Sequence, residues 1–297
     1  MDDLMNVSSM FYPQNGYGEN LNEYTECFKQ VIKERENVRI PFYHQSPQLA
    51  YRPYLIEYLR RLCMDKKFSH CCLHLAVYIL DTFMDCHNVE PGKILLLANV
   101  CLLLAAKFEE NIGKIPKISE INAAVFYRYS LREYRNLEVM VLQYFSWYIM
   151  FPTVAHYAHY YMQLATADEE ESSLHNVNQK AVLTQRFQHF VTNYLNQIID
   201  NIHYMQDFKP SKLAAAVIAA SRLHMGLKVW TPQLERMTDY TIQDVNDLLL
   251  TIMINRFFNK INNSLPSNRL CTSRQNYCTR CSVMSCPKCN FLQKINY

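Results

Sequence analysis

The chain has 297 residues, a net charge of +3, 5 glycines and 11 prolines. This length allows two domains of ordinary size, each with its own core. Because glycine and proline disturb helices most, their scarcity predicts an almost entirely helical chain. The first four residues lack the basic start of a secretory signal, and no apolar run reaches the roughly 20 residues that cross a bilayer, so we expect a location in the cytosol or nucleus.

The first half of the chain is predicted to contain one N-terminal helix and then five more. Residues 1–18 are polar and are expected to be disordered. In residues 19–37 apolar side chains recur every three or four positions, as in an amphipathic surface helix, and a proline-containing linker completes residues 19–49. Helical windows follow at 50–64, 70–86, 92–108, 117–127 and 130–146. They place a bundle of five helices in residues 50–151.

The second half repeats this arrangement. Helical windows lie at 153–166, 177–202, 210–225, 231–238 and 241–259. The central window of each half is either strongly apolar or rich in small residues, which lets neighbouring helices approach closely. We therefore predict an all-α fold of two consecutive five-helix bundles, residues 50–151 and 152–260, followed by a basic, cysteine-rich tail at 261–297.

The tail differs from the rest of the chain in charge and in cysteine content. No Asp or Glu follows Asp247, so the last fifty residues carry +7 and the rest carry −4. These cations are spread singly, so a solvated tail is a better explanation than contact with nucleic acid, acidic protein or an import receptor. Two Cys-x-x-Cys pairs could supply a tetrahedral zinc site, although the four residues between them are fewer than the roughly 15–20 of a zinc ribbon. The four ligands would be Cys278, Cys281, Cys286 and Cys289.

The most informative pattern in the first half is a charged pair at the edges of two apolar helices. An apolar run of 13 residues, 94–106, ends abruptly at Lys107-Phe108-Glu109-Glu110, and Glu138 lies inside a second apolar helix at 137–145. The run is apolar on all sides, so we expect a helix buried at the centre of a bundle. Taken alone, Lys107 also has a simple structural explanation, because a cation in the last turn favours the helix dipole.

These features together resemble the cyclin family over about residues 20–260. Residues 51–58, Tyr-Arg-Pro-Tyr-Leu-Ile-Glu-Tyr, fall where cyclins carry Met-Arg-Ala-Ile-Leu-Val-Asp-Trp, and Phe151-Pro152-Thr153 matches the join between the two cyclin boxes. Gln45-Ser46-Pro47-Gln48-Leu49 and Phe83-Met84-Asp85 are most similar to the cyclin J subfamily. Each hallmark residue of the first cyclin box has a counterpart here: Arg52, Leu55, Asp81, Lys107 and Glu138.

The resemblance implies a regulatory subunit of a cyclin-dependent serine/threonine protein kinase, acting in cell-cycle control in the nucleus, with the cytoplasm as a further location. Such a subunit holds the kinase αC helix inward and carries out no catalysis itself. Arg52 and Asp81 would form a structural ion pair, while Lys107 and Glu138 would bind the kinase. Phe108, Glu110 and Trp147 would extend that contact, together with one face of the N-terminal helix. For Trp147, packing in the core is an equal alternative, since large aromatic residues dominate both settings.

The resemblance also implies a substrate-docking patch on the first helix of the first box. In this chain its characteristic Met, Ile and Trp positions are replaced by tyrosines, which changes the polarity of such a patch. Its ability to dock substrates is therefore left open. The six positions are Tyr51, Tyr54, Leu55, Tyr58, Ile94 and Leu95.

Other functions that the sequence allows are less well supported. The transcription initiation factor B family has a similar fold and binds DNA, but a DNA-binding core should be basic and residues 1–247 carry −4. A cyclin-fold adaptor that activates no kinase is a further alternative. No catalytic motif was found, and His156 and His159 share a helix face without a carboxylate or cysteine at ligand spacing in sequence. Zinc in the tail is the one cofactor that we consider, and neither membrane nor nucleic-acid partners are expected.

Overall fold

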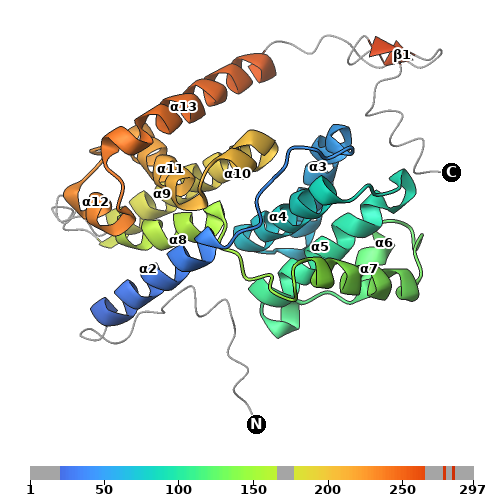
Figure 1. Ribbon diagram of the computed structural model, residues 1–297. Helices are drawn as coiled ribbons and strands as arrows, with labels where there is room; N and C mark the ends of the chain where they lie inside the picture. The colour runs from blue at the N-terminus through green and yellow to red at the C-terminus, as the bar shows by residue number, and fades with distance from the viewer. Residues whose placement is uncertain (1–20, 166–176, 265–276, 279–282, 285–297) are drawn as a thin grey trace.

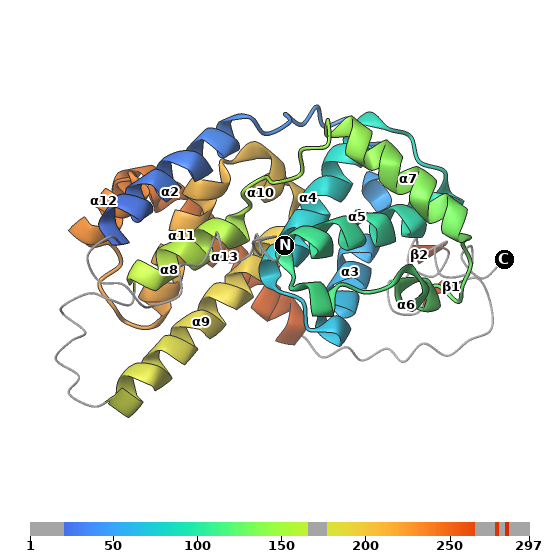
Figure 2. The ribbon, with the colours of Figure 1, turned by 90° about the horizontal axis from the view of Figure 1, so that it is seen from below.

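The computed structural model describes residues 21–165, 177–264, 277–278 and 283–284. Apart from two short strands, the regular elements in these ranges are helices arranged as two adjacent bundles (Figures 1 and 2). The predictions for residues 1–18 and for most of the tail lie outside the described residues. The α-helices are α2 (Leu21–Asn37), α3 (Arg52–Lys66), α4 (His70–Cys86), α5 (Ile94–Glu109), α6 (Ile118–Ala123), α7 (Leu131–Tyr144), α8 (Val154–Ala165), α9 (Val177–Asp200), α10 (Ile202–Asp207), α11 (Pro210–His224), α12 (Pro232–Thr238) and α13 (Ile242–Ser264).

The remaining elements are short. Three 3-10 turns precede α3, α5 and α6, and two strands of two residues each pair antiparallel, with Cys278 opposite Val283. The all-α prediction therefore holds for both bundles. These turns and strands are η1 (Leu49–Tyr51), η2 (Pro91–Lys93), η3 (Ile112–Lys114), β1 (Tyr277–Cys278) and β2 (Val283–Met284).

The first bundle is built around α5, as predicted from its apolar run. Every residue of α5 from Ile94 to Ala106 is buried, and α3, α4 and α7 pack around it. One statement from the sequence needs correction: Pro91–Glu109 is long and apolar enough to cross a membrane by length and composition. However, 72% of that window is buried inside the protein, so its hydropathy is accounted for by its position at the centre of the bundle.

Local signals set most helix boundaries close to their predicted positions. α4 begins where the Ser69 hydroxyl accepts the Cys72 amide hydrogen at 3.1 Å, and α7 begins at a capping box formed by Ser130 and Glu133. The window predicted at 117–127 is wrong at its end. There α6 stops at Ala123, and Phe126 and Tyr127 then adopt left-handed backbone angles, with φ of 55° and 56°, which no helix accommodates.

The second bundle is built around α11, whose run of small residues is fully buried against α8, α9 and α13. The helix predicted at 177–202 is α9, which ends at Asp200, and the short helix α10 that follows it was not predicted. Asn201 separates them because its side chain accepts the His203 amide hydrogen and so caps the new helix. The two central helices occupy equivalent positions in their bundles, which confirms the predicted duplication of architecture.

Helix α2 lies along the second bundle although it comes first in the chain (Figures 1 and 2). Glu36 accepts hydrogen bonds from the backbone and hydroxyl of Ser211, at 2.7 and 2.8 Å, and Tyr157 donates to the Ile32 carbonyl. The linker after α2 is attached to the first bundle instead, since Asp85 accepts the amide hydrogen of Gln45 at 2.8 Å. The N-terminal segment therefore fastens the two bundles to each other.

Candidate functional site

Lys107 and Glu138 form an ion pair at the rim of the first bundle. Lys107 is in the last turn of α5, Glu138 is in the middle of α7, and the ammonium group contacts Oε1 of the carboxylate. The Lys107 side chain is 46% exposed and that of Glu138 is 18% exposed. The two helices pack side by side, so a charged donor and a charged acceptor are held together where a partner can reach them.

Exposed apolar side chains continue from Glu138 along α7 and into the turn that follows. Val139 and Met140 are 42% and 51% exposed, and Trp147 is 62% exposed. Ser146 and Trp147 both have positive φ, and the Trp147 amide donates to the Leu142 carbonyl at 2.7 Å, which turns the chain sharply after α7. This turn places the indole at the surface, so core packing of Trp147 is excluded. Neither Val139 nor Met140 was predicted from the sequence as part of this surface.

The two other side chains predicted to extend this surface are placed differently. Phe108 is partly buried against the core. Glu110 is only 7% exposed, and its carboxylate accepts the Ser69 amide hydrogen at 2.6 Å. Because Glu110 faces inward and supports the start of α4, the structure assigns it a structural contact, and little of it is left for a partner.

The predicted structural pair of Arg52 and Asp81 is present. The guanidinium of Arg52 donates to both carboxylate oxygens of Asp81, at 2.9 and 2.8 Å, and both side chains are buried. Burial raises the pKa of Asp81, and the positive charge of Arg52 opposes that rise. A second contact was not foreseen: Arg52 also donates to the Asp200 carbonyl at 3.2 Å, which links α3 to the end of α9 in the second bundle.

The substrate-docking patch is not an open apolar surface in this structure. Its three aliphatic members belong to the core: Leu55 and Ile94 are 0% exposed and Leu95 is 7% exposed. The Tyr58 hydroxyl donates to the Asn99 side chain at 2.6 Å, and burial raises its pKa. Two partly buried tyrosines remain on the surface, Tyr51 and Tyr54. The aliphatic positions were misassigned because sequence spacing on a helix does not show which faces its neighbours cover.

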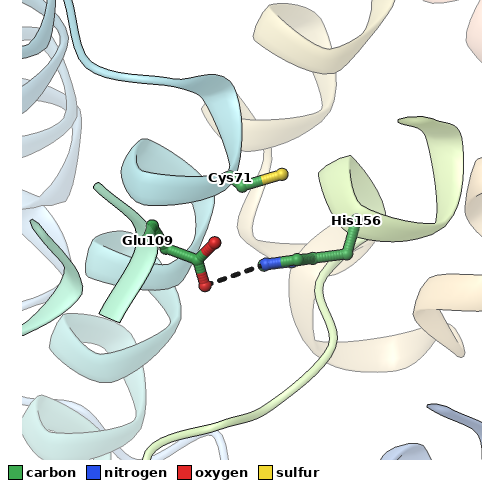
Figure 3. Close-up of side chains that lie close together, drawn as sticks. All are labelled: Cys71, Glu109 and His156. Atoms are coloured by element: carbon green, nitrogen blue, oxygen red, sulfur yellow. Dashed lines mark hydrogen bonds and ion pairs between the residues drawn. The ribbon is translucent and has the colours of Figure 1, made fainter. Parts of the chain in front are cut away.

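A cluster of titratable side chains at the junction of the bundles was missed. His156 at the start of α8 contacts Glu109 at the end of α5, with 3.0 Å between Nε2 and Oε1, and the thiol of Cys71 in the first turn of α4 lies within 4.8 Å of both (Figure 3). All three are buried. The statement that no carboxylate or cysteine accompanies His156 and His159 is thus wrong in space, since Cys71 Sγ lies 3.5 Å from Nδ1 of His159.

The charged forms of the side chains in this cluster stabilise one another. Burial alone would lower the pKa of His156 and raise that of Cys71. The nearby Cys71 and Glu109 instead raise the pKa of His156 well above its usual value, and the histidines lower the pKa of Cys71 to about 6. The sequence could not reveal this arrangement, because its members are separated by more than thirty residues. Of the cysteine tail, Cys278 lies in β1, while Cys281, Cys286 and Cys289 lie outside the described residues.

Comparison with known proteins agrees with the two-bundle architecture. Residues 24–150 match the family described as Cyclin, N-terminal domain, and residues 152–285 match Cyclin, C-terminal domain, which extends past residue 260 into the tail. Among solved structures, a viral cyclin from herpesvirus saimiri superposes with a TM-score of 0.58 at 16% identity, covering 76% of this chain and 95% of that chain. The yeast RNA Pol II CTD kinase CTDK-1 complex contains a chain with a TM-score of 0.53 at 16% identity, covering 82% of this chain and 77% of the other.

The curated relatives point to one subfamily. A cyclin-J-like protein of Mus musculus is 29% identical over 75% of this chain and 60% of its own length, and cyclin-J of Xenopus laevis is 30% identical over 71% of this chain and 56% of its own length. The chain thus spans less than two thirds of the length of these relatives. These similarities confirm the likeness to cyclin J, and because the two cyclin domains together occupy residues 24–285, the chain belongs to the cyclin family.

Proposed function

We propose that this chain is the regulatory subunit of a cyclin-dependent serine/threonine protein kinase, acting in cell-cycle control in the nucleus. The observation that carries the proposal is the Lys107–Glu138 pair at the rim of two packed helices. A kinase orients the ATP phosphates only when its β3 lysine is paired with the αC glutamate. A subunit that holds the αC helix inward therefore switches the kinase on without performing chemistry itself.

The geometry suits that task. Lys107 offers an ammonium donor and Glu138 a carboxylate acceptor, and each charged hydrogen bond to a backbone group contributes about 1.5–3 kcal/mol. The backbone of α5 near Lys107 is buried in the core, so the donor cannot drift far from its position. Trp147 and the exposed apolar residues of α7 would add contact area beside the charged pair, where large aromatic side chains commonly act as anchors.

The test is co-purification of a kinase from cell extract, comparing wild type with the double variant Lys107→Ala/Glu138→Gln. A matched control exists on the same two helices. Lys93 at the start of α5 pairs with Glu133 in the first turn of α7, with exposed fractions of 44% and 35%. Lys93→Ala/Glu133→Gln removes a similar ion pair whose lysine lies fourteen residues before Lys107 and whose carboxylate lies five residues before Glu138, about 7.5 Å along α7. Glutamine at 133 can still accept the Ser130 amide hydrogen and so preserves the cap.

We expect active kinase in the eluate of wild type and of the Lys93/Glu133 variant, and at least a tenfold loss in the Lys107/Glu138 variant. Equal recovery with all three proteins would refute the assignment of this surface. A folded wild type that captures no kinase would refute activation itself and favour a cyclin-fold adaptor or a nucleic-acid-binding factor. The latter would then be checked by salt-dependent DNA binding.

A further inference from the structure

The buried cluster at the junction of the two bundles has the composition of a metal site. Cys71, Glu109 and His156 each present one ligand atom, and these atoms lie within 4.8 Å of one another (Figure 3). We propose that Cys71, Glu109 and His156 bind a zinc-class divalent ion that joins the first cyclin box to the second. Within the described residues, Cys71 forms no disulfide, so its thiol is available as a ligand.

The distances are close to those a metal requires. Zinc bonds of about 2.3 Å to sulfur and about 2.0–2.2 Å to nitrogen and oxygen place tetrahedral ligand atoms about 3.3–3.6 Å apart. His156 Nε2 lies 3.0 Å from Glu109 Oε1, and Cys71 Sγ lies 3.5 Å from His159 Nδ1. The remaining separations among Cys71, Glu109 and His156 are bounded only at 4.8 Å, so these side chains would have to draw closer around an ion.

His159 is the fourth donor. It follows His156 by three residues, so both side chains project from one face of α8. His159 is only partly buried, unlike the other three, and this leaves a path by which an ion could enter. A thiolate with two imidazoles and one carboxylate suits zinc or cobalt, because the soft sulfur ligand disfavours magnesium and calcium.

The surroundings of His156 are compatible with metal binding through Nε2. Without an ion, Nε2 lies 3.0 Å from Glu109 Oε1, and the amide and hydroxyl groups of Thr153 lie 3.1 and 2.7 Å from Nδ1. Metal binding at Nε2 requires a hydrogen on Nδ1, which would donate to the Thr153 hydroxyl oxygen, and the Thr153 amide would then have to give up its bond to the ring. Such a contact behind the ring fixes a ligating histidine, as is usual at metal sites.

Burial gives a further reason to expect an ion here. Cys71, Glu109 and His156 are 1%, 5% and 3% exposed, and burying charged groups is costly unless they are paired or bound to a metal. A cluster held by hydrogen bonds alone is the competing explanation, and metal content separates the two.

The experiment must first remove the tail cysteines, which could bind zinc themselves. The parent protein is the full chain with all five tail cysteines replaced: Cys271→Ser, Cys278→Ser, Cys281→Ser, Cys286→Ser and Cys289→Ser. Two further variants add either Cys71→Ala or Cys72→Ala. Cys72 is a matched control because it is adjacent and 0% exposed, and its thiol interacts with Cys63. Zinc is measured by mass spectrometry after gel filtration, and Co²⁺ is added to the metal-free protein to record the thiolate-to-cobalt absorption band.

We expect about one zinc ion per chain in the parent and in the Cys72→Ala protein, and at least a tenfold loss with Cys71→Ala. The cobalt band should follow the same pattern. If circular dichroism shows that the Cys71→Ala protein fails to fold, the cobalt band of the parent decides whether a thiolate metal site exists outside the tail. That absorption requires a cysteine ligand. A folded parent without zinc or a cobalt band would overturn the proposal, as would full zinc retention in folded Cys71→Ala protein. Neither readout depends on kinase binding.

Discussion

The two cyclin boxes share an architecture, but the cation in the last turn of the central helix is exposed in one box and buried in the other. In the first box, α5 ends with Lys107, which is exposed and paired with Glu138 on the neighbouring helix. In the second box, α11 ends with Arg222, which is 2% exposed and donates to the Lys228 carbonyl in the turn that follows its own helix, at 2.7 Å. One cation is exposed in an ion pair at the surface, and the other is buried and closes a turn.

This difference shows that the repeated fold provides the frame, while a few side chains decide which box can bind a partner. The buried polar groups differ as well. Among the described residues, the buried side-chain atoms without a hydrogen-bond partner all come from residues before 75, and both ring nitrogens of His74 are among them. In the described residues, the buried polar atoms that lack a hydrogen-bond partner thus lie in the linker and the first box. Four predictions test this contrast.

The largest effect is expected for Asp81→Ala. This change leaves the Arg52 guanidinium buried without its carboxylate, which costs about 3–5 kcal/mol. Urea denaturation followed by circular dichroism measures the loss. As a control, Arg52→Met/Asp81→Leu removes both charges and should recover most of the stability, apart from the bond from Arg52 to the Asp200 carbonyl. An unchanged denaturation midpoint for Asp81→Ala would contradict the structural role of the pair.

The second prediction compares the two helix ends directly. Arg222→Met should lower the free energy of unfolding by about 1.5–3 kcal/mol, because a charged hydrogen bond is lost and the Lys228 carbonyl loses its donor. Lys107→Met should cost no more than about 1 kcal/mol, because exposed ion pairs contribute little. Kinase capture should show the reverse order. If both variants lose stability equally, the distinction between the two helix ends is wrong.

The sequence predicted most helices well because their signals are local. The apolar run of α5, the small residues of α11 and the proline that opens α11 lie within single segments, and each gave a boundary close to the observed one. Lys107, Glu138, Arg52 and Asp81 were paired correctly only through the family resemblance, because they come from separate helices. Composition and periodicity alone do not show which helix faces meet.

The errors share one cause, which is that burial is a property of the assembled fold. Leu55 and Ile94 were assigned to a surface patch, although neighbouring helices cover them completely. Glu110 was assigned to the kinase-facing surface, although its carboxylate supports the first turn of α4. Cys71, Glu109 and His156 were left unconnected because contacts between distant segments leave no periodic signal in the sequence.

The third prediction concerns acid stability. Burial lowers the pKa of His74 well below 6.5, with the nearby histidines and Arg60 adding to the effect, so the folded protein keeps this ring neutral. The unfolded chain takes up a proton below pH 6.5, and stability is therefore lost as the pH falls. The loss should reach about 1 kcal/mol between pH 6.5 and 5.5. His74→Leu should be less sensitive to acid over that range in urea titrations. Identical pH dependence in the two proteins would contradict this account.

The smallest effect on stability is expected for Trp147→Ala, and here the chain provides its own control. It contains two tryptophans, one in each box. Trp147 is 62% exposed, whereas Trp230 is 9% exposed and its indole N–H donates to the Tyr240 carbonyl at 3.1 Å. Trp147→Ala should change the free energy of unfolding by less than about 0.5 kcal/mol, while Trp230→Ala should cost about 3–5 kcal/mol.

Kinase capture should respond in the opposite sense. Truncating an exposed aromatic anchor costs about 2 kcal/mol of binding, which is roughly a thirtyfold loss for Trp147→Ala. Folded Trp230→Ala protein, measured at a temperature where it remains native, should capture the kinase normally, because Trp230 is enclosed within the second box. If Trp147→Ala loses much stability, Trp147 packs in the core, and the interpretation of its exposed indole is wrong. If the Trp147→Ala protein captures the kinase normally, the kinase contact is confined to the Lys107–Glu138 pair. The apolar face of α7 then takes no part in kinase binding.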